Sequence, residues 1–111
     1  MGVLGCLING VPGDRITVAD RGLQYGDGLF ETIAVRNGVP CLWTRHMERL
    51  RRGCHILELP LPDRLLDEAL SLTRDLDDVV LKVILTRGSG GRGYTPPDDP
   101  SPTRILSLHP S

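Results

Sequence analysis

Alternating apolar and polar positions predict short strands in the first part of the chain. Residues 4–8 form one such strand in this prediction, and Asn9-Gly10 after it is a two-residue turn typical of β-hairpins. We expect residues 16–18 to continue the same ribbon. The glycine-rich and polar stretch 20–28 then predicts a loop or a single helical turn.

A longer run over residues 29–35 predicts a strand with two faces. One face carries Phe30, Thr32 and Ala34, and the other carries Leu29, Ile33 and Val35. Asn37-Gly38 predicts a second hairpin turn into residues 39–43.

Two helices are predicted in the middle of the chain. Thr44 is a suitable N-cap for a helix over residues 45–59, which Pro60 would end. Asp63 is expected to cap a second helix that runs to about residue 75. The expected inward side chains are Met47, Leu50, Cys54 and Leu57 in the first helix, and Leu66, Ala69, Leu70 and Thr73 in the second.

The last third of the chain predicts two strands, residues 79–86 and 104–108, around a glycine-rich loop, residues 87–94. Strands, then two helices, then strands predict an α+β fold: a two-layer sandwich of a mostly antiparallel sheet with two helices. At 111 residues we expect a single domain, 1–111. Because the chain stops directly after an apolar strand, we also expect that a following domain is absent from it.

Composition and charge narrow the class of protein. Apolar residues make up 40% of the chain and charged residues 24%, as in a folded soluble domain. The net charge of −1 argues against a nucleic-acid partner, and no apolar stretch has the length needed to cross a bilayer. We therefore predict a cytoplasmic protein with neither a nucleic-acid nor a membrane partner. Three widely spaced cysteines, Cys6, Cys41 and Cys54, predict reduced thiols and no metal site.

The glycine-rich loop is the strongest candidate for a binding site. Four glycines within residues 87–94 allow positive φ angles and a close approach of the backbone to a ligand. Arg87 and Arg92 offer planar donor forks for carboxylates, and Tyr94 offers a phenol. The same composition also suits a surface hairpin with arginines for solubility, so the loop alone leaves both interpretations open.

Four motifs occur in one order along the chain. They are Asp20-Arg21-Gly22-x-x-Tyr25-Gly26-Asp27-Gly28-x-Phe30-Glu31-Thr32, His46-Met47-x-Arg49-Leu50, Leu81-Lys82, and the loop from Arg87 to Tyr94. Together they resemble the N-terminal domain of the class IV (fold-type IV) pyridoxal-phosphate-dependent enzymes, from Leu7 to Leu108. Within this family the loop is similar to that of the bacterial 4-amino-4-deoxychorismate lyases.

The resemblance implies a cofactor, a substrate and binding residues. The cofactor is expected to be pyridoxal 5′-phosphate, with Arg49 at the position of the family arginine that binds its phosphate. The substrate is expected to be aminodeoxychorismate, which the lyase converts to 4-aminobenzoate and pyruvate on the way to folate. The expected substrate-binding residues are Tyr25, Phe30, Lys82, Arg87, Arg92 and Tyr94. The family also implies a homodimer, in which the loop can reach the neighbouring subunit's site.

The residues taken alone leave other interpretations open. Arg49 also fits the solvated basic face of its helix, and Phe30 also fits simple core packing. Lys82 lies among apolar neighbours, where an ammonium group needs a partner or a polar site. Asp27 is expected to accept hydrogen bonds from backbone donors of its own bend, without a catalytic role.

The resemblance places the central chemistry outside this chain. In the family, the Schiff-base lysine and most phosphate donors belong to the C-terminal domain, and Lys82, the only lysine here, does not match that position. We therefore expect no catalytic residue in this chain and no activity from it alone. A branched-chain or D-amino-acid aminotransferase of the same family is the alternative enzyme. A non-catalytic fragment that needs a partner chain is the alternative from another class. The two arginines of the loop favour the lyase, because aminodeoxychorismate is a dicarboxylate.

Overall fold

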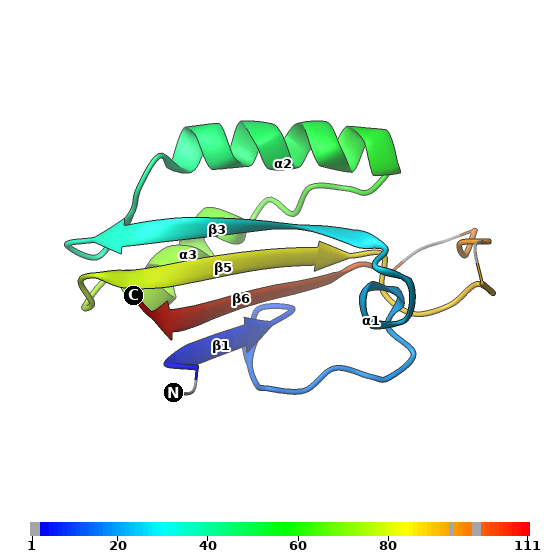
Figure 1. Cartoon of the computed structure of the whole chain (residues 1–111), viewed down its shortest axis with the longest axis horizontal. Coiled ribbons are helices and arrows are strands. Elements are labelled where there is room, and N and C mark those ends of the chain that lie inside the picture. Colours follow the sequence, from blue (N-terminus) through cyan, green and yellow to red (C-terminus); the bar gives the residue numbers. More distant parts are fainter. Residues whose placement is uncertain (1–2, 94, 99–100) are drawn as a thin grey trace.

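An antiparallel sheet with helices packed on one face forms the body of the molecule, as the computed structural model shows for residues 3–93, 95–98 and 101–111 (Figure 1). The strands of the described residues are β1 (Gly5–Ile8), β2 (Val11–Pro12), β3 (Gly28–Arg36), β4 (Val39–Pro40), β5 (Val79–Thr86) and β6 (Thr103–Pro110), in the sheet order β2-β1-β6-β5-β3-β4. The helices are α1 (Arg21–Tyr25), α2 (Trp43–Leu57) and α3 (Leu65–Thr73). The predicted α+β architecture is confirmed, with α1 as the predicted single turn.

Both predicted hairpin turns are present. Asn9 and Gly10 have φ angles of 52° and 81°, and Asn37 and Gly38 have φ angles of 52° and 76°, so both central residues of each turn are left-handed. This pattern belongs to the tight turns whose twist matches that of paired strands. The prediction for residues 16–18 is wrong. The strand that pairs with β1 is β2, and the chain leaves the sheet after Pro12, which has no backbone N–H to continue the ladder.

Helix α2 has the predicted buried stripe but different ends. Leu50 and Cys54 are buried, and Met47 and Leu57 pack against the core. Thr44 is not the N-cap, because the helix starts at Trp43 after a left-handed Leu42 that makes no side-chain cap. The helix ends at Leu57, two residues earlier than predicted. Glu58 there has a φ of 57°, and the Leu59 N–H donates to the Cys54 carbonyl.

Helix α3 buries Ala69 and Thr73 as predicted, but Leu65 is buried in place of Leu66. It starts at Leu65 after Arg64, and no side chain caps it, so the predicted Asp63 cap is wrong. Leu65, Ala69 and Thr73 face the core, while Leu66 is 44% exposed. Leu65 lies one helical turn before Ala69 and two before Thr73, so these three residues share one face, and Leu66 is turned about 100° away from Leu65.

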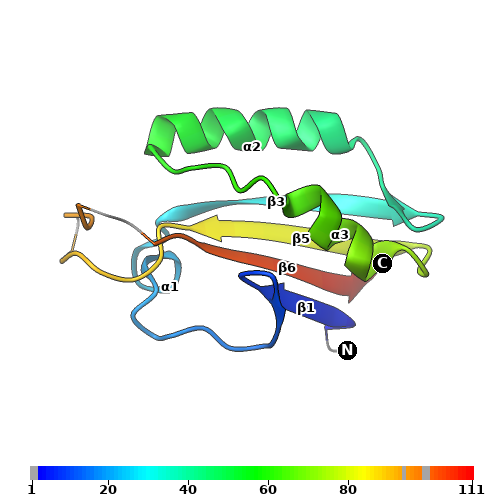
Figure 2. The ribbon, with the colours of Figure 1, turned by 180° about the vertical axis from the view of Figure 1, so that it is seen from behind.

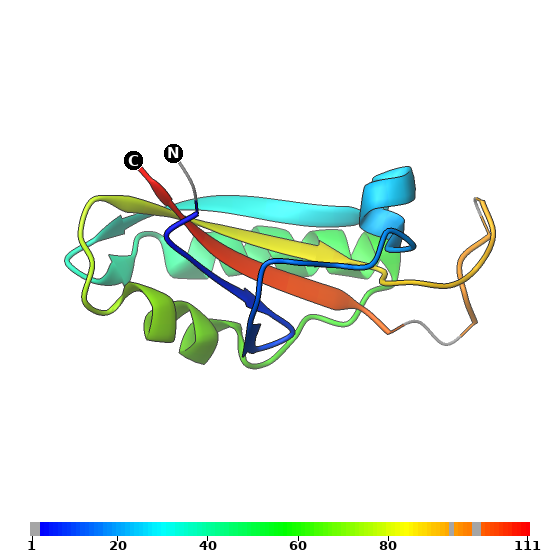
Figure 3. The same ribbon diagram turned by 90° about the horizontal axis from the view of Figure 1, so that it is seen from below.

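The core lies between the sheet and the two longer helices (Figures 2 and 3). Its strand members are Ile33, Val35, Val79, Leu81, Val83, Leu85, Leu106 and Leu108. The predicted faces of β3 are confirmed, since Ile33 and Val35 are fully buried and Phe30 is 62% exposed on the opposite face. That opposite face, which neither α2 nor α3 covers, is called the open face below. At one end of the sheet, α1 lies beside the point where β5 leads into the glycine-rich loop (Figure 1).

Candidate functional site

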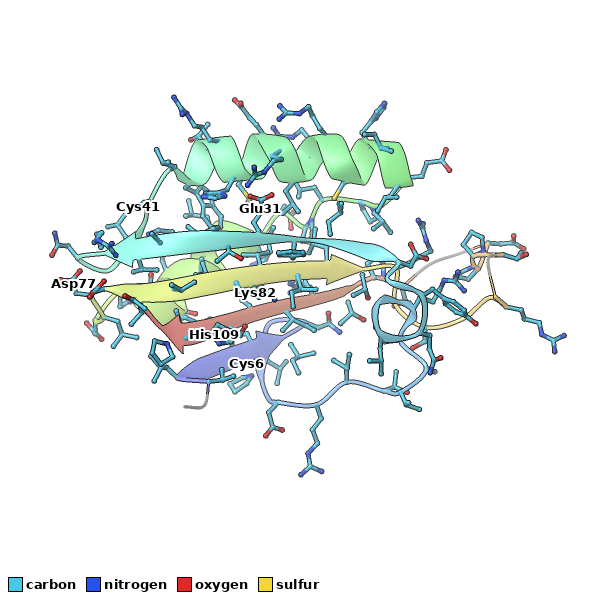
Figure 4. All side chains as sticks on the ribbon, viewed as in Figure 1. Cys6, Glu31, Cys41, Asp77, Lys82 and His109 are labelled. Carbon is cyan, nitrogen blue, oxygen red and sulfur yellow. The ribbon has the colours of Figure 1, made fainter. Side chains whose placement is uncertain are left out.

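A buried carboxylate joins β3 to α2. Glu31 lies on the same face of β3 as Ile33, and its side chain is only 5% exposed. A buried carboxylate needs donors, and α2 supplies them from two positions three residues apart. Arg49 donates from Nε to Oε2 at 2.9 Å and from Nη2 to Oε1 at 2.7 Å. The His46 Nδ1 atom lies 2.6 Å from Oε1. Figure 4 shows Glu31 in the layer between β3 and α2.

The charges in this cluster stabilise one another. The hydrogen bond from Arg49 is the largest influence on the pKa of Glu31 and lowers it, burial opposes this, and the hydrogen bond with His46 lowers it further. Glu31 in turn raises the pKa of Arg49. Glu31 is therefore an ionised carboxylate at neutral pH, held between two groups of one helix.

Arg49 keeps donor groups for a further partner. Its Nε edge is bound to Glu31, and Nη1 has no partner among the described residues. The side chain is 66% exposed. It lines a groove of about 600 Å³ between β3 and α2, together with Phe30, Thr32 and Arg52. A second hollow, of about 450 Å³, is also lined by Arg49, with Arg45, Arg52 and the acidic Glu48 beside it. This cationic position, with free guanidinium donors, suits an anion such as a phosphate.

Asp27 ties α1 to the glycine-rich loop. Instead of backbone donors of its own bend, its Oδ2 atom accepts hydrogen bonds from the Nε atoms of Arg21 and Arg87, both at 2.9 Å. Burial is the largest single influence on the pKa of Asp27 and acts to raise it, but the hydrogen bonds from both arginines together with their positive charges outweigh it and the pKa is lowered. Arg87 also donates from Nη2 to the Leu57 carbonyl at 2.7 Å, at the last residue of α2. Arg87 thus links three elements of the fold.

Arg21 is buried and donates hydrogen bonds to backbone carbonyls of the glycine-rich loop. Its Nη1 donates to the Gly90 carbonyl at 3.3 Å and its Nη2 donates to the Gly93 carbonyl at 2.7 Å. Its backbone N–H donates to the Gly88 carbonyl at 2.7 Å. Gly88 has a φ of 83°, and a Cβ there would collide with the Ser101 carbonyl oxygen, so only glycine fits at this point.

Asp20 fixes the start of α1 against two strands. One carboxylate oxygen accepts from the Gly22 N–H at 2.9 Å and caps the helix. The other accepts from the hydroxyls of Thr86 on β5, at 3.1 Å, and Thr103 on β6, at 2.8 Å. The base of the glycine-rich loop is therefore held by buried side chains, whereas Ser89, Gly90 and Gly91 beyond it are exposed.

Two of the sequence-predicted substrate residues gather beside this loop. The Tyr25 hydroxyl accepts from the Gly93 N–H at 3.2 Å, and the Arg21 guanidinium lies 4.7 Å from the Tyr25 ring centroid. Tyr25 and Arg87 line a hollow of about 270 Å³ with Arg21, Asp27 and Pro96. Arg92 is exposed, and its backbone pairs with Thr95. Tyr94 lies outside the described residues.

Two others meet on the open face. Lys82, labelled on β5 in Figure 4, is opposite Thr32 in the β3–β5 ladder. Its Nζ atom lies 4.9 Å from the centroid of the Phe30 ring. This cation–π contact supplies the partner that an ammonium among apolar neighbours needs. Phe30 is not a core residue. It borders both the Arg49 groove and an apolar hollow of about 410 Å³ that Leu23 and Ile84 also line.

Sequence reasoning did not assign Glu31 and Arg21. The signal for Glu31 was present, because the predicted register places this carboxylate among Leu29, Ile33 and Val35 on the inward face of its strand. A charge at such a position requires a donor on the layer that covers it. Arg21 carried no signal of this kind, since besides the nearby Asp27 its side-chain acceptors are loop carbonyls far along the chain.

Two further properties concern the described residues as a whole. None of their helices has both the length and the apolar character that crossing a membrane requires. No group of three or more His, Cys, Asp or Glu side chains among them is arranged to hold a metal ion.

The chain belongs to the amino-transferase class IV family, whose family model matches residues 28–111. It is 37% identical, over 102 residues, to an aminodeoxychorismate lyase of Vibrio harveyi, a match that covers 90% of this chain and 38% of that protein. Its fold is similar to the crystal structure of 4-amino-4-deoxychorismate lyase from Pseudomonas aeruginosa, with a TM-score of 0.87, 51% identity, and coverage of 95% of this chain and 39% of that one.

A hypothetical aminotransferase from Mycobacterium tuberculosis in its PLP-bound form is also similar. Its TM-score is 0.75 and its identity is 28%, with coverage of 88% of this chain and 34% of that one. The chain thus spans less than two fifths of the length of each of these proteins.

Proposed function

We propose that this chain is the N-terminal part of a pyridoxal-phosphate-dependent aminodeoxychorismate lyase. The observation that carries the proposal is Arg49: its guanidinium is fixed on one edge by Glu31, and its Nη1 group is left for an anion in a cationic groove. The 37% and 51% identities to two aminodeoxychorismate lyases support the lyase within the family.

The donor set fits the phosphate of the cofactor. Arg49 would bind the phosphate oxygens, and Arg45 and Arg52, which line the hollows beside it, would add positive potential. Pyridoxal phosphate, when bound, supplies an electron sink for the reaction. The role of this chain is to hold the phosphate of the cofactor in the groove between β3 and α2.

The substrate side of the site lies along the open face and the loop. Phe30 offers an exposed aromatic face for a flat ring, and Tyr25 adds a second aromatic side chain at the same end of the sheet. Lys82 and Arg92 are the cations that we assign to the substrate's two carboxylates, together with Tyr94. Arg87 is mostly committed to Asp27 and the Leu57 carbonyl, and it keeps only its remaining guanidinium donors for a carboxylate.

No catalytic residue is assigned to this chain. Lys82 lies over the Phe30 ring, and we give it a role in binding and none in proton transfer at the cofactor. We therefore expect the 111 residues alone to release no product, and we propose that the working enzyme is a cytoplasmic homodimer. Light scattering of the purified protein would show twice the subunit mass, and a monomer would contradict the dimer.

The experiment is a product assay on the protein that carries this chain, supplied with pyridoxal phosphate. With aminodeoxychorismate, we expect 4-aminobenzoate and pyruvate in equal amounts, measured by chromatography and by a coupled dehydrogenase. Amino-group exchange between D-alanine or a branched-chain amino acid and 2-oxoglutarate, without 4-aminobenzoate, would instead support the aminotransferase alternative. Arg49→Ala should abolish cofactor retention, whereas Arg51→Ala, an exposed arginine of the same helix, should leave it unchanged.

A further inference from the structure

The side-on pairing of Glu31 with Arg49 has a consequence for anion binding. A free arginine side chain samples many rotamers, and an anion that binds it restricts the side chain to one of them, which costs conformational entropy. Here two hydrogen bonds from Nε and Nη2 to one buried carboxylate leave the guanidinium a single orientation. The carboxylate itself is fixed, because it is buried and because His46 contacts its Oε1 atom. The outer donors of Arg49 are therefore oriented before any ligand arrives.

We propose that Glu31 is a positioning residue that orients Arg49 for the phosphate of the cofactor. This inference rests on the proposed function, in which Arg49 binds that phosphate. Glu31 lies below Arg49, on the buried face of β3, and acts through the guanidinium without touching the ligand. His46 supports it by holding Oε1 from the preceding turn of α2.

Two physical effects of Glu31 on phosphate binding have opposite signs. Its negative charge weakens the attraction between Arg49 and an anion, so a purely coulombic account predicts tighter phosphate binding when the charge is removed. Its hydrogen bonds preorganise Arg49, so positioning predicts weaker binding when they are lost. The sign of the effect of one substitution therefore separates the two accounts.

The chain offers a matched control in a second pair of the same geometry. Glu68 on α3 accepts from Arg104 Nε at 2.9 Å and from Arg104 Nη2 at 2.7 Å, with a side chain that is also mostly buried. This pair lines neither of the two hollows beside Arg49. Glu68→Gln removes the same chemistry and reports the cost of losing a bidentate pair without any effect on Arg49.

The test is a titration of the apo form of the protein that carries this chain with pyridoxal phosphate, and separately with pyridoxal, which has no phosphate. For Glu31→Gln we expect the Kd for pyridoxal phosphate to rise about tenfold, as for one charge-assisted hydrogen bond, with the Kd for pyridoxal unchanged. Glu31→Asp keeps the charge but withdraws the carboxylate by one methylene, and it should raise the same Kd. Glu68→Gln should leave both constants within about twofold.

A second readout needs no ligand. In the wild-type apo protein, the Nε–H proton of Arg49 is bonded to a buried carboxylate, and its NMR signal should be protected from exchange with water; in Glu31→Gln that protection should be lost. Unchanged or tighter binding of pyridoxal phosphate by Glu31→Gln and Glu31→Asp would overturn the positioning role.

The failure of the proposed function looks different. It would appear as a wild-type protein that does not bind pyridoxal phosphate, or as an Arg49→Ala variant that binds it as tightly as wild type. If Arg49→Ala loses binding while both Glu31 variants keep it, only the positioning role fails.

Discussion

Replacing Asp27 by asparagine should destabilise the fold more than any surface charge change, because one oxygen of Asp27 accepts from two arginines whose side chains are mostly withdrawn from water. Arg21 and Arg87 each donate from Nε to Oδ2 at 2.9 Å. The side chains of both arginines and of the aspartate are largely withdrawn from water. The asparagine has nearly the same shape but no charge, so the substitution isolates the electrostatic part of the contact.

The expected loss of free energy of unfolding follows from counting the hydrogen-bond acceptors that each arginine keeps in Asp27→Asn. A hydrogen bond to a charged group contributes about 1.5–3 kcal/mol, so the loss of two has an upper limit of about 6 kcal/mol. The asparagine carbonyl oxygen can take the place of Oδ2 as an uncharged acceptor, Arg21 keeps the Gly90 and Gly93 carbonyls, and Arg87 keeps the Leu57 carbonyl. Neither guanidinium is therefore left without acceptors. We expect Asp27→Asn to lower the free energy of unfolding by about 3 kcal/mol.

Urea unfolding, followed by circular dichroism and extrapolated linearly to zero denaturant, measures this free energy. The control is Asp14→Asn, which removes an exposed pair in which Asp14 lies 3.5 Å from Arg15, with side chains 87% and 94% exposed. That control should change the free energy of unfolding by less than about 0.5 kcal/mol. A change within the same limit for Asp27→Asn, at an unchanged m-value, would refute the assignment of Asp27 as a buried link.

Three further predictions concern the pH dependence of stability, one glycine and the core. The pKa values of Asp27 and Glu31 are lowered in the folded state, so their contribution to stability is complete above the unfolded values near 4 and is lost as the pH falls through the folded values. The urea midpoint should therefore fall with pH below about 4.5, less steeply in Asp27→Asn, and equal slopes would contradict this. Gly88→Ala places a Cβ against a backbone carbonyl, whereas Gly26→Ala places one in open space, although both glycines have a positive φ, 83° and 66°. Gly26→Ala should lower the free energy of unfolding by about 1 kcal/mol and Gly88→Ala by more, and equal losses in urea unfolding would contradict the steric argument. Leu81→Ala empties a fully buried position under both helices and should cost about 3 kcal/mol in the same assay, and a loss below about 1 kcal/mol would contradict its place in the core.

The strands were predictable because the hydrophobic pattern and the turn residues that define each of them lie within or next to the strand itself. The run 79–86 coincides with β5, since six of its eight residues are apolar and polar residues precede and follow it. The two Asn-Gly pairs made both hairpins predictable for the same reason, because asparagine and glycine adopt the positive φ angles of a two-residue turn at the lowest cost. The prediction for 16–18 failed because a β-branched triplet is equally compatible with a coil segment, and residues 11 and 12 had already completed the hairpin with β1.

The helix ends were less predictable because they depend on left-handed backbone conformations at residues whose types do not favour them. Leu42 and Glu58 both adopt left-handed φ angles, which their residue types disfavour, and together they bound α2. The Pro60 rule placed the end too late, because the residue before a proline already avoids the helical region and the turn began one residue earlier still.

The two arginines of the glycine-rich loop show why site residues cannot be assigned from residue type alone. Arg87 and Arg92 have the same chemistry and similar neighbours in the sequence, yet Arg87 is bound to Asp27 and to the end of α2, while Arg92 is exposed. What separates them is the presence of a buried acceptor within reach, and that acceptor is 60 residues away along the chain. Arg49 combines both conditions, with one edge held by Glu31 and its remaining donors toward the groove. An arginine that is fixed on one side and accessible on the other is the arrangement that a binding site requires, and it is visible only once β3 and α2 have been packed together.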